Sequence, residues 1–183
     1  TASATIVGTT VNVVTAGVTA VTADAGKGTI ATGVVKILDN ATASIKTVSV
    51  DGYKTTSVIG VNGASTAASL NALTDLTLAN SDIGADIDVA TTATSLNLTL
   101  NNITSKITAV ADSAKINLDH NGNATANGSK TIKTLNITTA GKDSDVEITA
   151  AAVETLTVSG TNALDLTAST LTALKTVTVS GTA

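Results

Sequence analysis

Short runs of alternating apolar and polar residues recur along the chain and predict a series of β-strands. The recurring motif has the form apolar-x-x-apolar-x-apolar, as at residues 73–78 and 153–158. Its central apolar residue is Leu76, Leu96, Ile116, Leu135, Leu156 and Val177, at spacings of 20, 20, 19, 21 and 21 residues. Alternation with a period of two is typical of strands that bury one face. The regular spacing predicts a repeat architecture.

A second strand-like run follows the first in most repeats, with Gly, Asn and Asp beside it. Examples are residues 87–89, 107–110, 146–148 and 164–166. Gly, Asn and Asp form turns, through positive φ or through side-chain bonds to the backbone. Two strands and two turns in about 20 residues describe one coil that buries its apolar face only when stacked. We therefore predict an all-β fold, a parallel β-helix or β-solenoid with about 20 residues per coil.

Stacking the coils in register makes the six central apolar residues one buried column, with a second column two residues further on. The residues between these columns then face outward, and they are Thr77, Asn97, Asn117, Asn136, Thr157 and Thr178. Near the start of the strand Lys133, Glu154 and Lys175 alternate in sign, which is favourable in adjacent coils. The same register places Asp86 beside Lys106.

The N-terminal part fits this pattern less well. A copy of the motif around Val48 lies 28 residues before Leu76, which indicates an enlarged coil or a boundary. Strand-like runs at 11–13, 18–21 and 34–37 are separated by glycine-rich turns. We expect residues 1–44 to form irregular β coils or the edge of a neighbouring β domain, and residues 45–183 to form β-solenoid repeats.

A leucine-rich-repeat-like solenoid is the alternative fold. Residues 93–103 match the leucine-rich pattern, and the repeat length lies in its range. However, only two of the six copies keep the asparagine of that pattern, at Asn101 and Asn121. The rest of each coil also lacks the leucines that a helical outer side needs.

The composition limits the kind of core that the chain can form and the kinds of partner that it can bind. The chain has no Cys, Pro, Met, Trp or Phe and a single Tyr, so the predicted core is narrow and aliphatic. A net charge of −4 counts against nucleic acid, which attracts clustered basic residues. No apolar run approaches the length of a membrane-spanning helix, so we expect no membrane insertion. The chain begins at Thr1, so we expect it to be a piece of a longer protein.

Two groups of oxygen-bearing side chains are candidate ligands for Ca²⁺. The first group is Asp119, Asn121 and Asn123, and the second is Asp82, Asp86 and Asp88. The first is spaced like the start of a calcium loop, in a predicted turn over residues 119–123. In the second, Asp86 and Asp88 are alternate residues of one strand and share a face. A third acidic group is Asp143, Asp145 and Glu147. The alternative is that all these carboxylates only solubilise exposed faces.

Catalytic chemistry has little support in the sequence. His120 is the only histidine and lies in the predicted turn, so no histidine cluster exists for a metal or a triad. Parallel β-helices host some glycan-processing enzymes. Such enzymes usually need aromatic residues that stack on sugars, and this chain has a single Tyr. Outward hydroxyls at residues 155–159 and 176–180 also resemble the flat grids of ice-binding solenoids. We expect the chain not to be an enzyme.

The composition of the sequence and its short recurring strings resemble those of a known protein class. Thr, Ala, Val, Asn and Gly dominate, with strings such as Leu-Thr-Val-Ser-Gly at 156–160 and Val-Thr-Val-Ser-Gly at 177–181. This resembles bacterial surface-layer (S-layer) proteins of the type I-secreted, RTX-like class and related large adhesins. The resemblance implies an extracellular place on the bacterial cell surface, a crystalline or fibrous coat, and calcium-dependent assembly. The Gly-Gly-x-Gly-x-Asp calcium repeat of that secretion class is absent.

These observations lead to one functional hypothesis and its alternative. We expect a structural segment of a secreted cell-surface protein that acts by self-association. Its partners would be further copies in a homo-oligomer or lattice and neighbouring domains of the same protein. The alternative is an adhesin or an ice- or surface-binding β-solenoid module.

Overall fold

The computed structural model describes residues 2–6, 10–14, 33–39, 45–60, 72–81, 85–103, 114–120 and 131–181. Every regular element within these ranges is a β-strand, and none is a helix. The strands are β1 (Ala2–Ile6), β2 (Thr10–Val14), β3 (Val35–Asp39), β4 (Thr47–Tyr53), β5 (Ser57–Ile59), β6 (Asp75–Ser81), β7 (Asp86–Ala90), β8 (Ser95–Asn101), β9 (Ala114–His120), β10 (Thr134–Thr139), β11 (Ser144–Thr149), β12 (Thr155–Gly160), β13 (Leu164–Asp165) and β14 (Thr176–Gly181). The all-β prediction is confirmed for the described part of the chain.

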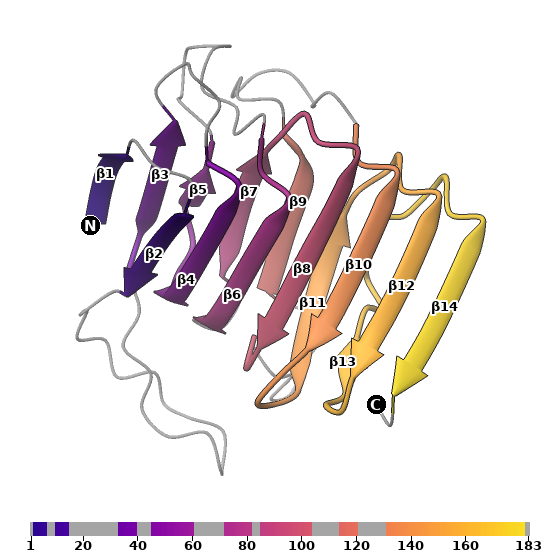
Figure 1. Ribbon diagram of the computed structural model, residues 1–183. Helices are drawn as coiled ribbons and strands as arrows, with labels where there is room; N and C mark the ends of the chain where they lie inside the picture. Colours follow the sequence, from indigo (N-terminus) through magenta and orange to yellow (C-terminus); the bar gives the residue numbers. More distant parts are fainter. Residues whose placement is uncertain are drawn as a thin grey trace.

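Consecutive strands alternate between two parallel sheets (Figure 1). The odd sheet has the order β1-β3-β5-β7-β9-β11-β13, and the even sheet has the order β2-β4-β6-β8-β10-β12-β14. Parallel neighbours must be joined by a crossover, and here each crossover contains a strand of the other sheet. The arrangement is compatible with the predicted β-solenoid. It argues against the leucine-rich alternative, because a second sheet stands where that fold has its helical side.

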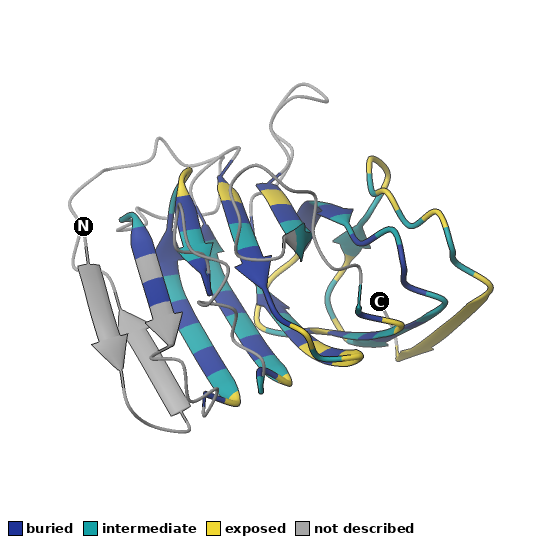
Figure 2. Ribbon diagram, turned by 90° about the horizontal axis from the view of Figure 1, so that it is seen from above, coloured by how far each residue is buried: buried dark blue, intermediate teal, exposed yellow. Residues whose placement is uncertain are grey.

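Aliphatic side chains from both sheets fill the space between them. Because apolar and polar residues alternate, each strand turns one face inward. Fully buried residues include Val48, Leu76, Leu78, Leu96, Leu98, Leu135 and Ile137 in the even sheet, and Ile37, Ile59, Ile87, Ile116 and Ile148 in the odd sheet. Figure 2 shows this alternation as bands of buried and intermediate residues. Tyr53, the only aromatic side chain of the Phe, Trp and Tyr class, is also fully buried, and burial raises the pKa of its hydroxyl above the usual range.

Part of the predicted register is confirmed. Leu135 of β10 pairs with Leu156 of β12, which in turn pairs with Val177 of β14. On its other side Leu135 pairs with Leu96 of β8, where Ile116 was predicted. The last two repeats therefore have the predicted length. The spacing from Val48 to Leu76 corresponds to one enlarged repeat, because β4 and β6 pair directly.

The position predicted for Ile116 is wrong. Ile116 lies in β9 of the odd sheet, where it pairs with Ile87 of β7 and Ile148 of β11. The 39 residues from Leu96 to Leu135 thus form one long repeat and not two short ones. The misassignment has a physical cause: both sheets bury alternate aliphatic residues, so their strands share one motif.

The predicted alignment of Leu76 with Leu96 is also wrong. Leu76 pairs with Leu98, and Leu78 pairs with Leu100. A strand that shifts by two residues keeps the same side chains on the buried face, whereas a shift by one exchanges the faces. Alternation therefore determines the buried face of β8 but leaves its alignment with β6 open.

Asparagines stabilise the corners at the ends of even strands. Asn80 and Asn102 adopt left-handed φ values of 54° and 57°, a conformation that Asn tolerates better than most residues. Asn102 Nδ2 donates to Asn80 Oδ1 at 2.7 Å, and Asn80 Nδ2 donates to Asp51 Oδ1 at 2.6 Å. These two hydrogen bonds link a carboxylate and two amides and join the corners of three successive repeats.

The N-terminal strands continue the same two sheets. β1 pairs with β3, and β2 pairs with β4. The strands predicted at 11–13 and 34–37 are confirmed as β2 and β3. The runs predicted at 18–21 and 107–110 lie outside the described residues. The division between residues 44 and 45 stays a prediction.

Candidate functional site

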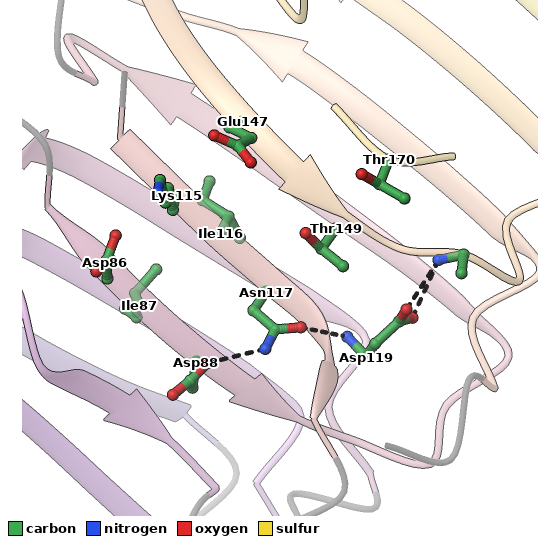
Figure 3. Close-up of a pocket in the computed structure, with 11 residues that line it drawn as sticks. Asp86, Ile87, Asp88, Lys115, Ile116, Asn117, Asp119, Glu147, Thr149 and Thr170 are labelled. Carbon is green, nitrogen blue, oxygen red and sulfur yellow. Dashed lines mark hydrogen bonds between the residues drawn. The ribbon is translucent and has the colours of Figure 1, made fainter. Parts of the chain in front are cut away.

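A groove of about 490 Å³ lies on the outer face of the odd sheet (Figure 3). Strands β7, β9 and β11 form its floor, and the segment after β11 closes one side. Its polar lining comprises Asp86, Asp88, Lys115, Asn117, Asp119, Glu147, Thr149 and Thr170. Four carboxylates therefore face a single lysine, so the groove is acidic.

Strand register aligns this lining in two rows. Asp86 of β7 pairs with Lys115 of β9, which pairs with Glu147 of β11. Carboxylates thus lie on both sides of the lysine, and opposite charges on neighbouring strands are favourable. The structure corrects the prediction that Asp86 lies beside Lys106, because Lys115 occupies the paired position and Lys106 lies outside the described residues.

The second row is held by hydrogen bonds. Asn117 Nδ2 donates to Asp88 Oδ1 at 3.0 Å, and the Asp119 amide donates to Asn117 Oδ1 at 3.1 Å. The Asp119 carboxylate accepts from the Ala151 amide, at 3.1 Å to Oδ1 and 3.0 Å to Oδ2. Asp119 therefore joins β9 to the corner that follows β11, which is a structural role.

The predicted calcium groups are brought together only in part. Asp86, Asp88 and Asp119 come from two separate predicted groups and line one groove. Asp82, Asn121 and Asn123 lie outside the described residues. Within the described ranges no three or more His, Cys, Asp or Glu side chains gather in a way that could hold a metal ion. Calcium binding stays a prediction.

The turn predicted at 119–123 is wrong at its first two residues, and its other residues lie outside the described ranges. Asp119 and His120 are the last residues of β9, and His120 pairs with Ala90 of β7 after a register irregularity. The strand extends this far because it continues to pair with β7. In the third acidic group, Asp145 is buried, whereas the Asp143 carboxylate accepts from the Ala163 amide at 2.9 Å.

Lys115 and Glu147 are groove residues that the sequence-based reading did not connect with Asp86. A signal for them exists in the pattern charged-Ile-polar, which occurs as Asp-Ile-Asp at 86–88, Lys-Ile-Asn at 115–117 and Glu-Ile-Thr at 147–149. These three runs are the paired segments of β7, β9 and β11. The unequal repeat lengths obscure the match.

The outer face of the even sheet is polar and uncharged over its last four strands. Twelve positions form three rows, namely Ser95, Thr134, Thr155 and Thr176; Asn97, Asn136, Thr157 and Thr178; and Thr99, Thr138, Ser159 and Ser180. None of these residues is buried. Asn136 Nδ2 donates to Asn97 Oδ1 at 3.0 Å, and the hydroxyls of Thr138 and Ser159 lie 3.1 Å apart. The predicted outward ladder is confirmed for Asn136, Thr157 and Thr178, and Asn97 faces outward as predicted.

The ladder differs from the prediction at its other positions. Asp75, and not Thr77, pairs with Asn97, and Asn117 belongs to the odd sheet. Asn97 Nδ2 donates to Asp75 Oδ1 at 2.8 Å. Hydrogen bonds from Asn97 and then Thr74 hold the pKa of the Asp75 carboxyl below its usual value.

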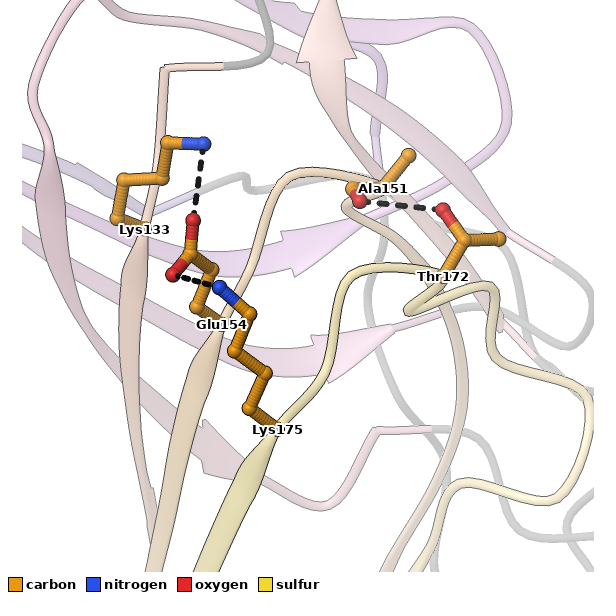
Figure 4. A network of polar contacts seen from close by, with 5 residues as sticks. All are labelled: Lys133, Ala151, Glu154, Thr172 and Lys175. Atoms are coloured by element: carbon orange, nitrogen blue, oxygen red, sulfur yellow. Dashed lines mark hydrogen bonds and ion pairs between the residues drawn. The ribbon is translucent and has the colours of Figure 1, made fainter.

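The predicted alternation of charge at the strand starts is confirmed. Glu154 lies between Lys133 at 3.4 Å and Lys175 at 2.7 Å (Figure 4). The hydrogen bond from Lys175 and then that from Lys133 lower the pKa of the Glu154 carboxyl. The three side chains are solvent-exposed, so the network fixes register more than it adds stability.

The even sheet ends at an exposed strand. Every residue of β14 is exposed, and Val177 and Val179 are 54% and 63% exposed. In β12 the paired Leu156 and Val158 are buried. Figure 2 shows the exposed strand at the end of the stack opposite the N-terminus. Two columns of the core thus emerge at this end without a cover in the described structure.

The described residues contain no helix with the length and apolarity that a membrane span requires. The sequence matches no protein-family model, and neither curated proteins nor solved structures give a significant match to it.

Proposed function

We propose that the chain is a β-solenoid segment of a secreted bacterial cell-surface protein, of the S-layer or large-adhesin kind, and that it acts by self-association. The alternation of strands between two parallel sheets supports the solenoid. Repeats stacked in this way bury a narrow aliphatic core by repetition, which suits an elongated structural element.

The observation that supports self-association most directly is the outer face of the even sheet, which is regular and uncharged over β8, β10, β12 and β14. Its hydroxyl and amide side chains both donate and accept hydrogen bonds, so the same face of a second copy is a complementary partner. No charged residue lies among its twelve positions to repel that copy.

A structural role also fits the chemistry of the groove. Its charged residues pair across strands, and its Asp88 and Asp119 carboxylates already accept hydrogen bonds from the protein. Recognition of sugars relies on exposed aromatic rings, and the chain's one such ring, Tyr53, is fully buried. We propose no catalytic function for the chain.

The proposal is tested by charging this face. In Thr157→Lys a lysine enters the middle of the face, between Asn136 and Thr178, and would be buried in any contact formed there. An unpaired buried charge costs well over the roughly 1.4 kcal/mol that corresponds to tenfold in affinity. We therefore expect association of this variant to be weakened more than about tenfold, as measured by sedimentation velocity over a concentration series.

Thr92→Lys is the matched control. It adds the same charge at an exposed position between β7 and β8, outside this face. This variant should associate like the unmodified chain. If the unmodified chain is monomeric at all concentrations, with and without calcium, self-association is refuted. Equal association of all three proteins would place the contact elsewhere than at the outer face of the even sheet.

A surface-binding or ice-binding module is the second candidate, and the uncharged outer face of the even sheet favours it. Twelve small hydroxyl and amide side chains are aligned there in three rows. Adjacent strands are about 4.8 Å apart and alternate residues about 6.7 Å apart, which gives a regular grid. Thr157→Lys places a charge in the grid, so it should abolish thermal hysteresis if this function is correct. No hysteresis in the unmodified protein would exclude ice as the ligand.

A further inference from the structure

The groove on the odd sheet contains a row of alternating charge. This row, the groove row, consists of Asp86, Lys115 and Glu147, at paired positions of the adjacent strands β7, β9 and β11. Its charges read negative, positive, negative along the stack. Figure 3 shows hydrogen bonds from the second row of the groove, through Asn117 and Asp119, and none from the groove row. Asp86 and Lys115 are exposed, so the groove row is accessible to a partner.

A second row of alternating charge lies at the corner where even strands begin. This row, the corner row, consists of Lys133, Glu154 and Lys175, which directly precede β10, β12 and β14 (Figure 4). The Glu154 amide donates to the Lys133 carbonyl and the Lys175 amide to the Glu154 carbonyl, both at 2.9 Å, so the three residues occupy equivalent positions. Their charges read positive, negative, positive. The side chains of Lys133 and Lys175 are 53% and 69% exposed, so they are available for contact.

The two rows are complementary in sign and in spacing. Each row takes one charge from each of three neighbouring repeats, so successive charges lie about 4.8 Å apart in both. Placing one row along the other therefore brings an opposite charge to every position. The net charges also favour this contact: four carboxylates and one lysine give the groove −3, and two lysines and one glutamate give the corner row +1. A flexible basic segment lacks the fixed spacing, so a second copy of this chain is the partner that fits best.

We propose that the corner row of one copy docks against the groove row of a second copy, so that the two stacks lie side by side. This inference rests on the proposed self-association and adds a second, lateral contact to it. A contact between the outer faces of two even sheets uses the same surface on both copies and ends at a dimer. The groove row and the corner row are different surfaces, so each copy can offer one row to each of two neighbours. Together the two contacts produce an open array.

Charges of this kind determine the alignment of the two copies more than they add affinity. Exposed ion pairs are weak and are screened by salt. However, a shift of one copy by a single strand spacing would bring like charges together along both rows, and like charges across an interface exclude that alignment. The lateral contact should therefore have one preferred alignment and should weaken at high salt. The contact through the uncharged face of the even sheet should not show this dependence on salt.

Exchange of the central charges tests the contact. Lys115→Glu makes the groove row uniformly negative, so that its centre repels Glu154 of a second copy, and Glu154→Lys makes the corner row uniformly positive, so that its centre repels Lys115. Sedimentation velocity at low salt measures the species larger than a dimer. Each variant alone should form them about tenfold or more weakly than the unmodified chain. The two variants mixed, and a chain with both substitutions, should recover them, because a uniformly negative row then faces a uniformly positive one.

Lys142→Glu is the matched control, because it makes the same change of charge at an exposed position outside both rows, and it should assemble like the unmodified chain. Circular dichroism checks that each variant is folded, and Glu154→Lys tests the contact independently if Lys115→Glu does not fold. Large species that persist in either folded variant, or in 1 M salt, where the Debye length is about 3 Å, would overturn the inference and leave self-association intact. Failure of the two substitutions together to restore these species would also overturn it. Monomers at every concentration would refute both proposals.

Discussion

Leu135 provides a direct test of the aliphatic spine. Its side chain is fully buried, and its paired neighbours on the two sides are Leu96 and Leu156. Leu135→Ala removes three carbon atoms, a loss of about 2.4 kcal/mol at about 0.8 kcal/mol per buried methylene. Hydrogen bonds fix the spacing of β8, β10 and β12, so the cavity collapses little. With the cavity cost added, we expect a loss of about 3–4 kcal/mol in the free energy of unfolding.

Val177→Ala is the matched control, because Val177 continues the same column at the exposed end. It removes two carbon atoms from a side chain that is 54% exposed, so the loss should stay below about 1 kcal/mol. Urea unfolding followed by far-ultraviolet circular dichroism measures both. The near-ultraviolet signal of Tyr53, in β4, tests whether distant repeats unfold together, as stacked repeats need not. The assignment of Leu135 to the core is refuted if its truncation costs no more than that of Val177.

Three further predictions concern the corners, the charges and the register. Gly160 has a φ of 121°, and a Cβ there would collide with the backbone of β10, so Gly160→Ala should lower the urea midpoint more than a typical surface substitution. The lowered pKa of Glu154 means that its lysine partners stabilise the fold above about pH 4.5 and that this stability is lost as the pH falls. Glu154→Gln should therefore flatten the acid branch of the pH–stability profile at low salt. Finally, cysteines at Thr77 and Thr99 should form a disulfide, whereas cysteines at Thr77 and Asn97 should not, because only the first two are paired.

Alternation alone predicted which residues are buried. In every described strand with a long alternating run, such as β4 and β10, the apolar residues face the core, as the period of two requires. The register was predictable where charged residues mark the starts of the strands. Lys133, Glu154 and Lys175 identify three successive strand starts by their charge, and β10, β12 and β14 have the predicted alignment.

The prediction of the register failed where no charged residues mark the strand starts and where the repeats differ in length. Between Leu96 and Leu135 the long repeat contains a strand of the other sheet whose Ile-x-Leu pattern matches the even strands. Ile116, the central residue of that strand, lies about halfway between Leu96 and Leu135. The apparent spacing of about 20 residues therefore does not correspond to two repeats here. The groove was missed for the same reason, because it depends on aligning β7, β9 and β11 across unequal repeats.

The ambiguity of the strand register has a physical origin. Strands built from Thr, Val and Ser offer each other the same hydrogen bonds and the same small side chains, so almost any two of them fit. Inside the chain, the ion pairs of Glu154 with Lys133 and Lys175 and the corner hydrogen bond of Asn80 and Asn102 select one alignment among many. A chain of this kind therefore needs charged residues and asparagines at particular positions to select one pairing between its own strands.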